Sequence, residues 1–184
     1  YKYAIEAAQK GRDITEDELN AALAKTPDIV AARGMLCGML LEDEKRTDEA
    51  AECLDLLPAD SMQALIGRSQ IASLRKDHAG EREILKKILL SGSPERVKLL
   101  LAIADTYMEE GNKEEALRTV DIAIKQDSRD ISSYLFLFQI YTGLGRADDA
   151  LSAFRRFTAS NPLSPDLLAQ GIRLYSDAGH AEEA

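Results

Sequence analysis

The feature that most constrains this chain is a period of 34 residues in its second half. Three segments share a tyrosine, a glycine four residues later and an alanine five residues after that; they run from Tyr107 to Ala116, from Tyr141 to Ala150 and from Tyr175 to Ala184. A fixed period of this length is typical of stacked helical repeats, in which each unit buries its apolar face against its neighbours. The sequence therefore predicts an array of repeats rather than a fold around one central core.

Each repeat predicts two helices joined by a short turn. Over residues 94–126, the stretch "VKLLLAIADTYM" is apolar on most sides, and "KEEALRTVDIAI" has one apolar stripe. Ser93 and Pro94 suit the start of the first helix, and Gly111 can take the positive φ that ends it. The acids Glu114 and Glu115 lie in the first turn of the second helix, where the helix dipole favours them. They are therefore helix-start residues rather than a catalytic pair.

This pattern resembles the tetratricopeptide repeat, a helix-turn-helix unit of 34 residues. The unit from Ile131 carries the family's characteristic residues at Tyr134, Leu137, Tyr141, Gly145, Ala150, Phe154 and Pro162. The unit from Val97 matches at Leu100, Ile103, Tyr107, Gly111, Ala116 and Val120, but has Ser128 in place of the proline. The resemblance implies an all-α fold, a right-handed superhelical solenoid of antiparallel helix pairs with about five and a half repeats.

We expect a single array over residues 1–184, with degenerate repeats over 1–96 and clear repeats over 97–130, 131–164 and 165–184, the last of them truncated. The chain is expected to be part of a longer protein. The turns are predicted near Gly11, Glu44, Asp77, Gly111, Gly145 and Gly179, and Thr15 with Glu18 suits a capping box.

Two features of the degenerate half carry expectations of their own. Gly34 and Gly38 fall inside a predicted helix, where each costs about 1 kcal/mol against alanine unless close packing uses it. Cys37 and Cys53 lie among apolar residues and form no metal-type motif. We therefore expect buried, reduced thiols without metal.

The charge of the chain disfavours nucleic acid as a partner. The net charge is −9, and an acidic surface repels a phosphate backbone. Residues 63–96 are the exception, with 7 basic and 4 acidic side chains. This stretch is either a docking face or the solvated side of two helices; its basic residues are Arg68, Arg75, Lys76, Arg82, Lys86, Lys87 and Arg96.

No apolar run is long enough to suggest a membrane span. The compartment is not fixed by the sequence; a cytoplasmic location is favoured, and a periplasmic one stays open.

A catalytic function finds no support in the sequence. The two histidines, His78 and His180, fall in predicted turns without a recurring ligand spacing, and there is no glycine-rich phosphate loop or nucleophile motif. We expect no enzymatic activity, no metal and no cofactor.

The resemblance implies a scaffold that binds a peptide or helical segment of a partner protein in a concave groove lined by the first helices. The family's ligand-contacting positions then give the candidate partner-binding residues Lys98, Leu101, Asp105, Met108, Leu135, Gln139, Thr142 and Arg173. Leu101 and Leu135 could equally be core residues. Two alternatives stay open: an assembly arm of a bacterial secretion, pilus or exopolysaccharide machine, and a non-catalytic part of an enzyme whose active domain lies elsewhere.

The last repeat predicts a further contact surface. The sequence ends at Ala184, where the second helix of this repeat should begin, so Ile172 and Tyr175 are expected to lack part of their cover. Arrays of this kind normally end in a polar capping helix. We therefore expect self-association through the open C-terminal end.

Overall fold

A computed structural model describes residues 14–126, 131–159, 161, 165–177 and 179 of the chain. Ten α-helices and one 3-10 turn account for most of these residues, and none of them belongs to a β-strand. The prediction of an all-α fold is confirmed. The helix pair expected to begin before residue 14, with its turn at Gly11, falls partly outside the described residues, as do Ser128, Pro162 and His180.

The chain divides into two compact units, residues 1–88 and 89–184. Unit 1 contains α2 (Glu16–Lys25), α3 (Val30–Leu41), η1 (Glu44–Arg46), α4 (Thr47–Asp55), α5 (Met62–Leu74) and most of α6 (His78–Leu90). Unit 2 contains α7 (Arg96–Glu109), α8 (Lys113–Gln126), α9 (Ile131–Gly143), α10 (Ala147–Thr158) and α11 (Pro165–Asp177).

The predicted turns of unit 2 lie where the glycines are. Gly111, Gly145 and Gly179 follow α7, α9 and α11 with φ of 75°, 68° and 79°, a region that favours glycine because it has no Cβ. Two turns in the described part of unit 1 form without glycine: η1 begins at Glu44, and Lys76 takes a φ of 57° between α5 and α6. The predicted turns near Glu44 and Asp77 therefore form at the expected places, although neither has a glycine with positive φ.

The helix starts agree with the sequence in one case and differ in another. Thr15 and Glu18 form the predicted capping box: the Glu18 N–H donates to Thr15 Oγ1 at 3.4 Å, and the Thr15 N–H donates to Glu18 Oε2 at 3.0 Å. Helix α7, in contrast, begins at Arg96, two residues later than Pro94 would place it. The Ser93 hydroxyl instead accepts from the Glu95 N–H at 3.3 Å, which holds a short turn ahead of the helix.

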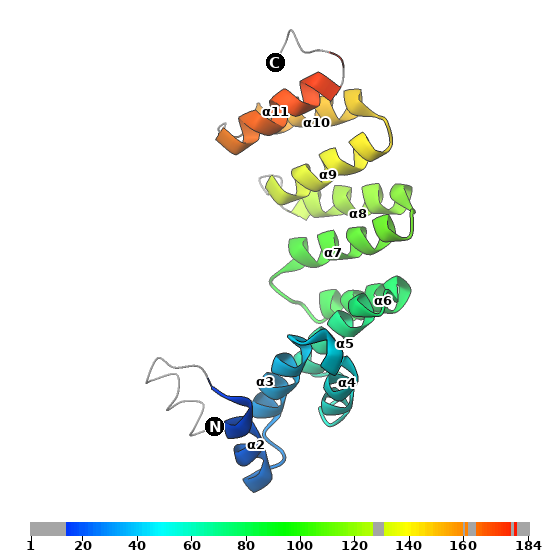
Figure 1. Cartoon of the computed structure of the whole chain (residues 1–184). Helices are drawn as coiled ribbons and strands as arrows, with labels where there is room; N and C mark the ends of the chain where they lie inside the picture. Colours follow the sequence, from blue (N-terminus) through cyan, green and yellow to red (C-terminus); the bar gives the residue numbers. More distant parts are fainter. Residues whose placement is uncertain (1–13, 127–130, 160, 162–164, 178, 180–184) are drawn as a thin grey trace. The chain divides into compact units, whose positions relative to one another are not determined.

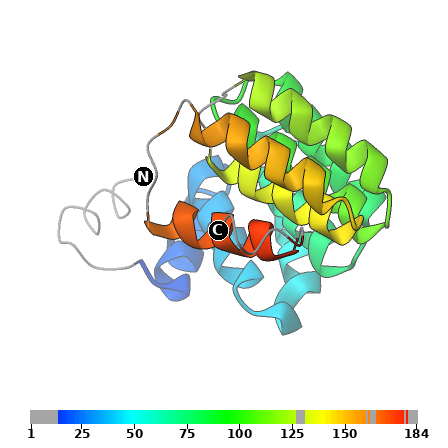
Figure 2. The same cartoon turned by 90° about the horizontal axis from the view of Figure 1, so that it is seen from above.

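Unit 2 is a stack of helix pairs (Figure 1). Seen along the stack in Figure 2, the second helices α8 and α10 lie on one side, and the first helices α9 and α11 lie on the other. The predicted small residues Ala116 and Ala150 are fully buried, which lets neighbouring helices approach closely. Phe138 and Phe154 meet edge to face with ring centroids 5.9 Å apart, a favourable aromatic geometry that joins α9 to α10.

Glycines allow the close helix contacts of unit 1. A Cβ added at Gly67 of α5 would lie 2.6 Å from a methyl group of Leu54 on α4, and one added at Gly34 of α3 would lie 2.9 Å from the Gln63 side chain. Gly38 differs, because a Cβ there would meet nothing within 4 Å. Packing thus explains Gly34, whereas Gly38 borders open space on the surface of α3.

The prediction of reduced thiols is wrong. Cys37 of α3 and Cys53 of α4 form a disulfide, with their Cα atoms 5.5 Å apart, and both residues are buried. The sequence placed each cysteine on an apolar helix face, but only the packing of α3 against α4 brings the two faces together. The bond joins the two helices of one pair across a separation of 16 residues.

An ion-pair cluster ties α2 to the start of α4. The Arg46 guanidinium donates to both carboxylate oxygens of Glu16, at 2.7 and 2.8 Å, and to Glu49 at 2.9 Å. These hydrogen bonds lower the pKa of Glu16 and raise the pKa of Arg46. The cluster holds α2 against the η1–α4 turn. This turn contains no glycine.

Candidate partner-binding surfaces

The predicted partner-binding residues of unit 2 lie on its first helices. Five are exposed and three are half-buried. The exposed residues are Lys98 and Asp105 on α7, Gln139 and Thr142 on α9, and Arg173 on α11; the half-buried ones are Leu101, Met108 and Leu135. Helices α7 and α9 contact each other directly, so their residues share one continuous surface.

Leu101 and Leu135 belong partly to the core of unit 2. Both are half-buried, and both pack against the buried cluster that contains Ala104, Val120 and Leu137. Each of these two side chains has one part in the core and one part that is accessible from the groove face. Charged substitutions there would disturb the core and the surface together.

A groove lies between α3 and α5, the first helices of two pairs in unit 1. Its volume is about 640 Å³. The lining comes from the second half of both helices: Met35, Gly38, Met39, Leu41, Glu42, Gln70, Ser73 and Leu74. Gly38 contributes to the hollow because it has no side chain to fill it. The lining combines apolar side chains with the polar residues Gln70 and Ser73 and one charged residue, Glu42.

The groove continues into an exposed apolar stripe along α5. Met62, Ile66, Gln70 and Leu74 follow one another at four-residue spacing, which places them on one side of the helix. Ile66 and Leu74 are 46% and 41% exposed, and Met35 across the groove is 42% exposed. Large apolar side chains that remain exposed together, rather than singly, typically mark an interaction site.

Sequence reasoning missed this surface in unit 1. Helix α5 carries apolar residues around most of its circumference, so periodicity alone cannot say which of them remain exposed. The four-residue spacing from Met62 to Leu74 was the available signal. Whether these residues are exposed depends on α3 and α4, which pack against other sides of α5.

Three of the seven basic residues in the stretch 63–96 form ion pairs with acids. Arg68 contacts Asp55 at 3.3 Å, Arg75 contacts Asp48 at 2.7 Å, and Lys86 contacts Glu83 at 2.9 Å. These pairs are accessible to solvent, where such contacts contribute little stability. The arrangement favours the interpretation as a solvated helix surface over a docking face.

The described residues include no group of three metal-ligating side chains close enough to hold an ion. Among the helices they form, none is both long and apolar enough to cross a bilayer.

Comparisons with known proteins agree with this architecture. Residues 101–165 match the family model described as tetratricopeptide repeat. A comparison with curated protein sequences gives no match.

Three solved structures illustrate the likeness in fold. The structure of pilF from Pseudomonas aeruginosa aligns with a TM-score of 0.68 at 15% identity, covering 99% of this chain and 85% of its own. YrrB, described as a tetratricopeptide protein with an unusual peptide-binding site, aligns with a TM-score of 0.62 at 16% identity, covering 92% and 88%. A thermophilic tetratricopeptide protein of Thermus thermophilus aligns with a TM-score of 0.57 at 17% identity, covering 96% of each chain.

At these identities the structures establish the fold, and the family model establishes the repeat. Such repeats form protein–protein interaction scaffolds and are generally non-catalytic. Residues 101–165 are similar in sequence to the tetratricopeptide repeat, and the chain shares the fold of solved tetratricopeptide repeat proteins.

Proposed function

We propose that the chain is a non-enzymatic scaffold that binds an amphipathic helical segment of a partner protein on the first-helix face of its repeats. The observation that carries the proposal is the groove between α3 and α5, together with the exposed stripe that continues it. A helix laid in such a groove buries its apolar face and keeps its polar face in water.

The chemistry of the groove favours this kind of partner. Methionine side chains such as Met35 and Met39 are flexible and adapt to differently shaped apolar residues. The single charged lining residue is Glu42, and the surrounding residues 1–62 carry a net charge of −7. A partner helix with Lys or Arg beside its apolar face would therefore be attracted, and an acidic one would be repelled.

The first-helix face of unit 2 is proposed to contact the partner as well. Its exposed residues Lys98, Gln139, Thr142 and Arg173 offer hydrogen bonds and charges beside the accessible parts of Leu101 and Leu135. Lys98 donates to Glu95 at 2.7 Å, and this hydrogen bond raises the pKa of Lys98. The roles of assembly arm and of enzyme subunit remain alternatives that no feature of the described residues favours.

The test is selection of binding peptides from a displayed library, followed by calorimetry with two matched variants. Ile66→Asp places a charge in the groove stripe, and Ile122→Asp places one at a similarly exposed isoleucine on α8, 48% exposed against 46%. We expect Ile66→Asp to weaken binding by about tenfold or more, since it buries a charge under the peptide.

Ile122→Asp should leave the affinity unchanged. Selected peptides should also show apolar residues at helical spacing. Peptides that bind the Ile66→Asp variant as tightly as the original chain would contradict the proposal, provided that circular dichroism shows both variants to be equally helical.

A further inference from the structure

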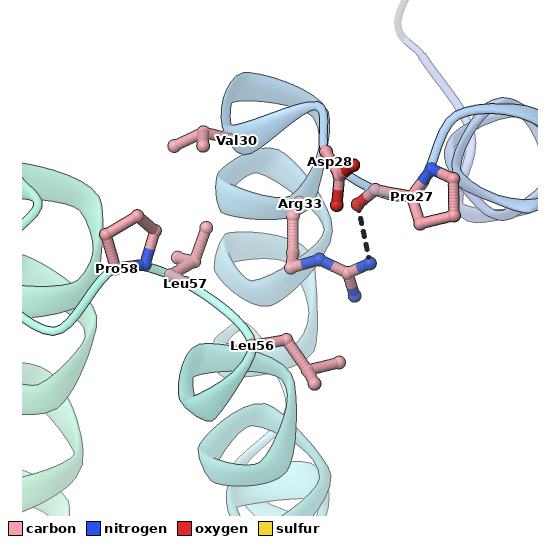
Figure 3. A pocket seen from close by; sticks show the side chains of 7 residues that line it. All are labelled: Pro27, Asp28, Val30, Arg33, Leu56, Leu57 and Pro58. Carbon is pink, nitrogen blue, oxygen red and sulfur yellow. Dashed lines mark hydrogen bonds between the residues drawn. The ribbon is translucent and has the colours of Figure 1, made fainter.

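A second hollow lies at the loop edge of unit 1, away from the groove between α3 and α5. Its volume is about 470 Å³, and it lies where the α2–α3 loop and the first turns of α3 meet the end of α4 (Figure 3). The residues that line it are Pro27, Asp28, Val30, Arg33, Leu56, Leu57 and Pro58. None of them lines the groove, so the two sites are separate.

Two polar side chains of this edge pocket, Arg33 and Asp28, keep hydrogen-bonding capacity that the described protein atoms do not use. Arg33 Nη2 donates to the Pro27 carbonyl at 3.0 Å, which holds the guanidinium across the pocket (Figure 3). A guanidinium has five N–H donors, and within the described part of the chain this is the one hydrogen bond recorded for it. The exposed Asp28 carboxylate beside it has no recorded partner among the described residues.

The apolar part of the pocket is exposed but firmly held. Leu56 is 66% exposed, yet its N–H donates to the Cys53 carbonyl at 3.3 Å as the cap of α4. The disulfide from Cys53 to Cys37 fixes that end of α4 to α3, which carries Val30 and Arg33. The disulfide and the cap hydrogen bond therefore tie the backbones of the two walls together, and a preformed site loses less entropy on binding.

We propose that this edge pocket binds an extended peptide segment with one apolar side chain. A main-chain carbonyl accepts from Arg33, a nearby main-chain N–H donates to Asp28, and the apolar side chain covers Leu56 and Val30. A peptide backbone supplies an acceptor and a donor together without net charge, which matches the opposite charges of these two residues.

The same chemistry argues against other occupants. A small anion would meet the Asp28 carboxylate, and a small cation would meet the Arg33 guanidinium. A helix has its main-chain groups bonded internally, so it has no free N–H or carbonyl to offer along its middle. The edge pocket therefore differs from the α3–α5 groove in the conformation of its partner.

A nuclear magnetic resonance titration of the whole chain tests this proposal. The probe is the neutral peptide acetyl-Ser-Gly-Leu-Gly-Ser-amide, which is too short to form a stable helix. We expect saturable shifts of the amides of Asp28, Arg33 and Leu56. The control peptide, with serine in place of leucine, should give none, because it lacks the side chain that covers Leu56.

Variants separate this site from the groove. Leu56→Asp and Asp28→Ala alter exposed side chains, and each should weaken binding of the probe, the first by about tenfold. Leu90→Asp, at an 86% exposed leucine outside the pocket, should leave binding unchanged. The same should hold for Ile66→Asp in the exposed stripe of α5. Shifts confined to α5 and the second half of α3, no saturable shifts, or undiminished binding by Leu56→Asp with a well-dispersed spectrum would each overturn the proposal.

Discussion

Reduction of the Cys37–Cys53 disulfide should strongly destabilise unit 1 and leave unit 2 unchanged. The bond closes a loop with a separation of 16 residues between the buried faces of α3 and α4. In the chain-entropy model, a cross-link over a loop of this length lowers the conformational entropy of the unfolded chain, which stabilises the folded state by about 3 kcal/mol. That corresponds to about two orders of magnitude in the unfolding equilibrium. The loss acts on unit 1, because both cysteines belong to it.

Hydrogen exchange measured by mass spectrometry can resolve the two units. With reductant, the amides of α3 and α4 should exchange about a hundredfold faster where exchange requires unfolding of unit 1. Amides of α8 and α10 should keep their rates. The Cys37→Ala/Cys53→Ala variant is the control, because reductant should have no effect on it. Two free thiols in the untreated chain, or protection of α3 and α4 that reductant leaves unchanged, would refute this reasoning.

Four further predictions concern packing, pH and association. Gly67→Val should destabilise unit 1 by about 1–3 kcal/mol in urea unfolding, since its side chain would overlap the leucine of α4. Gly38→Ala should stabilise it by up to about 1 kcal/mol, because alanine favours helix and space is open there. Because Arg46 lowers the pKa of Glu16, the stability from this pair should be present above the ordinary carboxyl pKa and lost as pH falls through the lowered one; Glu16→Gln should remove that part of the acid dependence of urea unfolding. Ile172 is 54% exposed on α11, so Ile172→Lys should reduce self-association in sedimentation equilibrium, and an unchanged association constant would count against this surface.

The features predictable from the sequence are those that neighbouring residues determine. The turn at Gly111 depends on a backbone conformation that glycine adopts easily, and the capping box at Thr15 depends on residues three apart. The small residue Ala116 follows from the repeat pattern, because each copy needs a close contact at the same place. These interactions involve residues of the same repeat, so the sequence of that repeat predicts them.

The features missed are those that depend on how helices meet. The disulfide requires the faces of Cys37 and Cys53 to lie opposite each other, which the spacing of the two residues does not determine. The exposed stripe through Ile66 results from which sides of an apolar helix its neighbours cover. Leu101 lies between groove and core for the same reason, since its burial depends on the helices beside α7.

The most direct test of partner binding in the first-helix groove is site-specific photocrosslinking in extracts of the source organism. The photoreactive residue p-benzoylphenylalanine replaces Gln70 in the groove of unit 1 or, as a control, the exposed Glu52 on α4. We predict a protein adduct from position 70 that position 52 does not give. Its crosslinked segment should carry apolar residues at helical spacing beside Lys or Arg. No adduct at position 70, or the same adducts from both positions, would contradict the claim that the first-helix groove binds the partner.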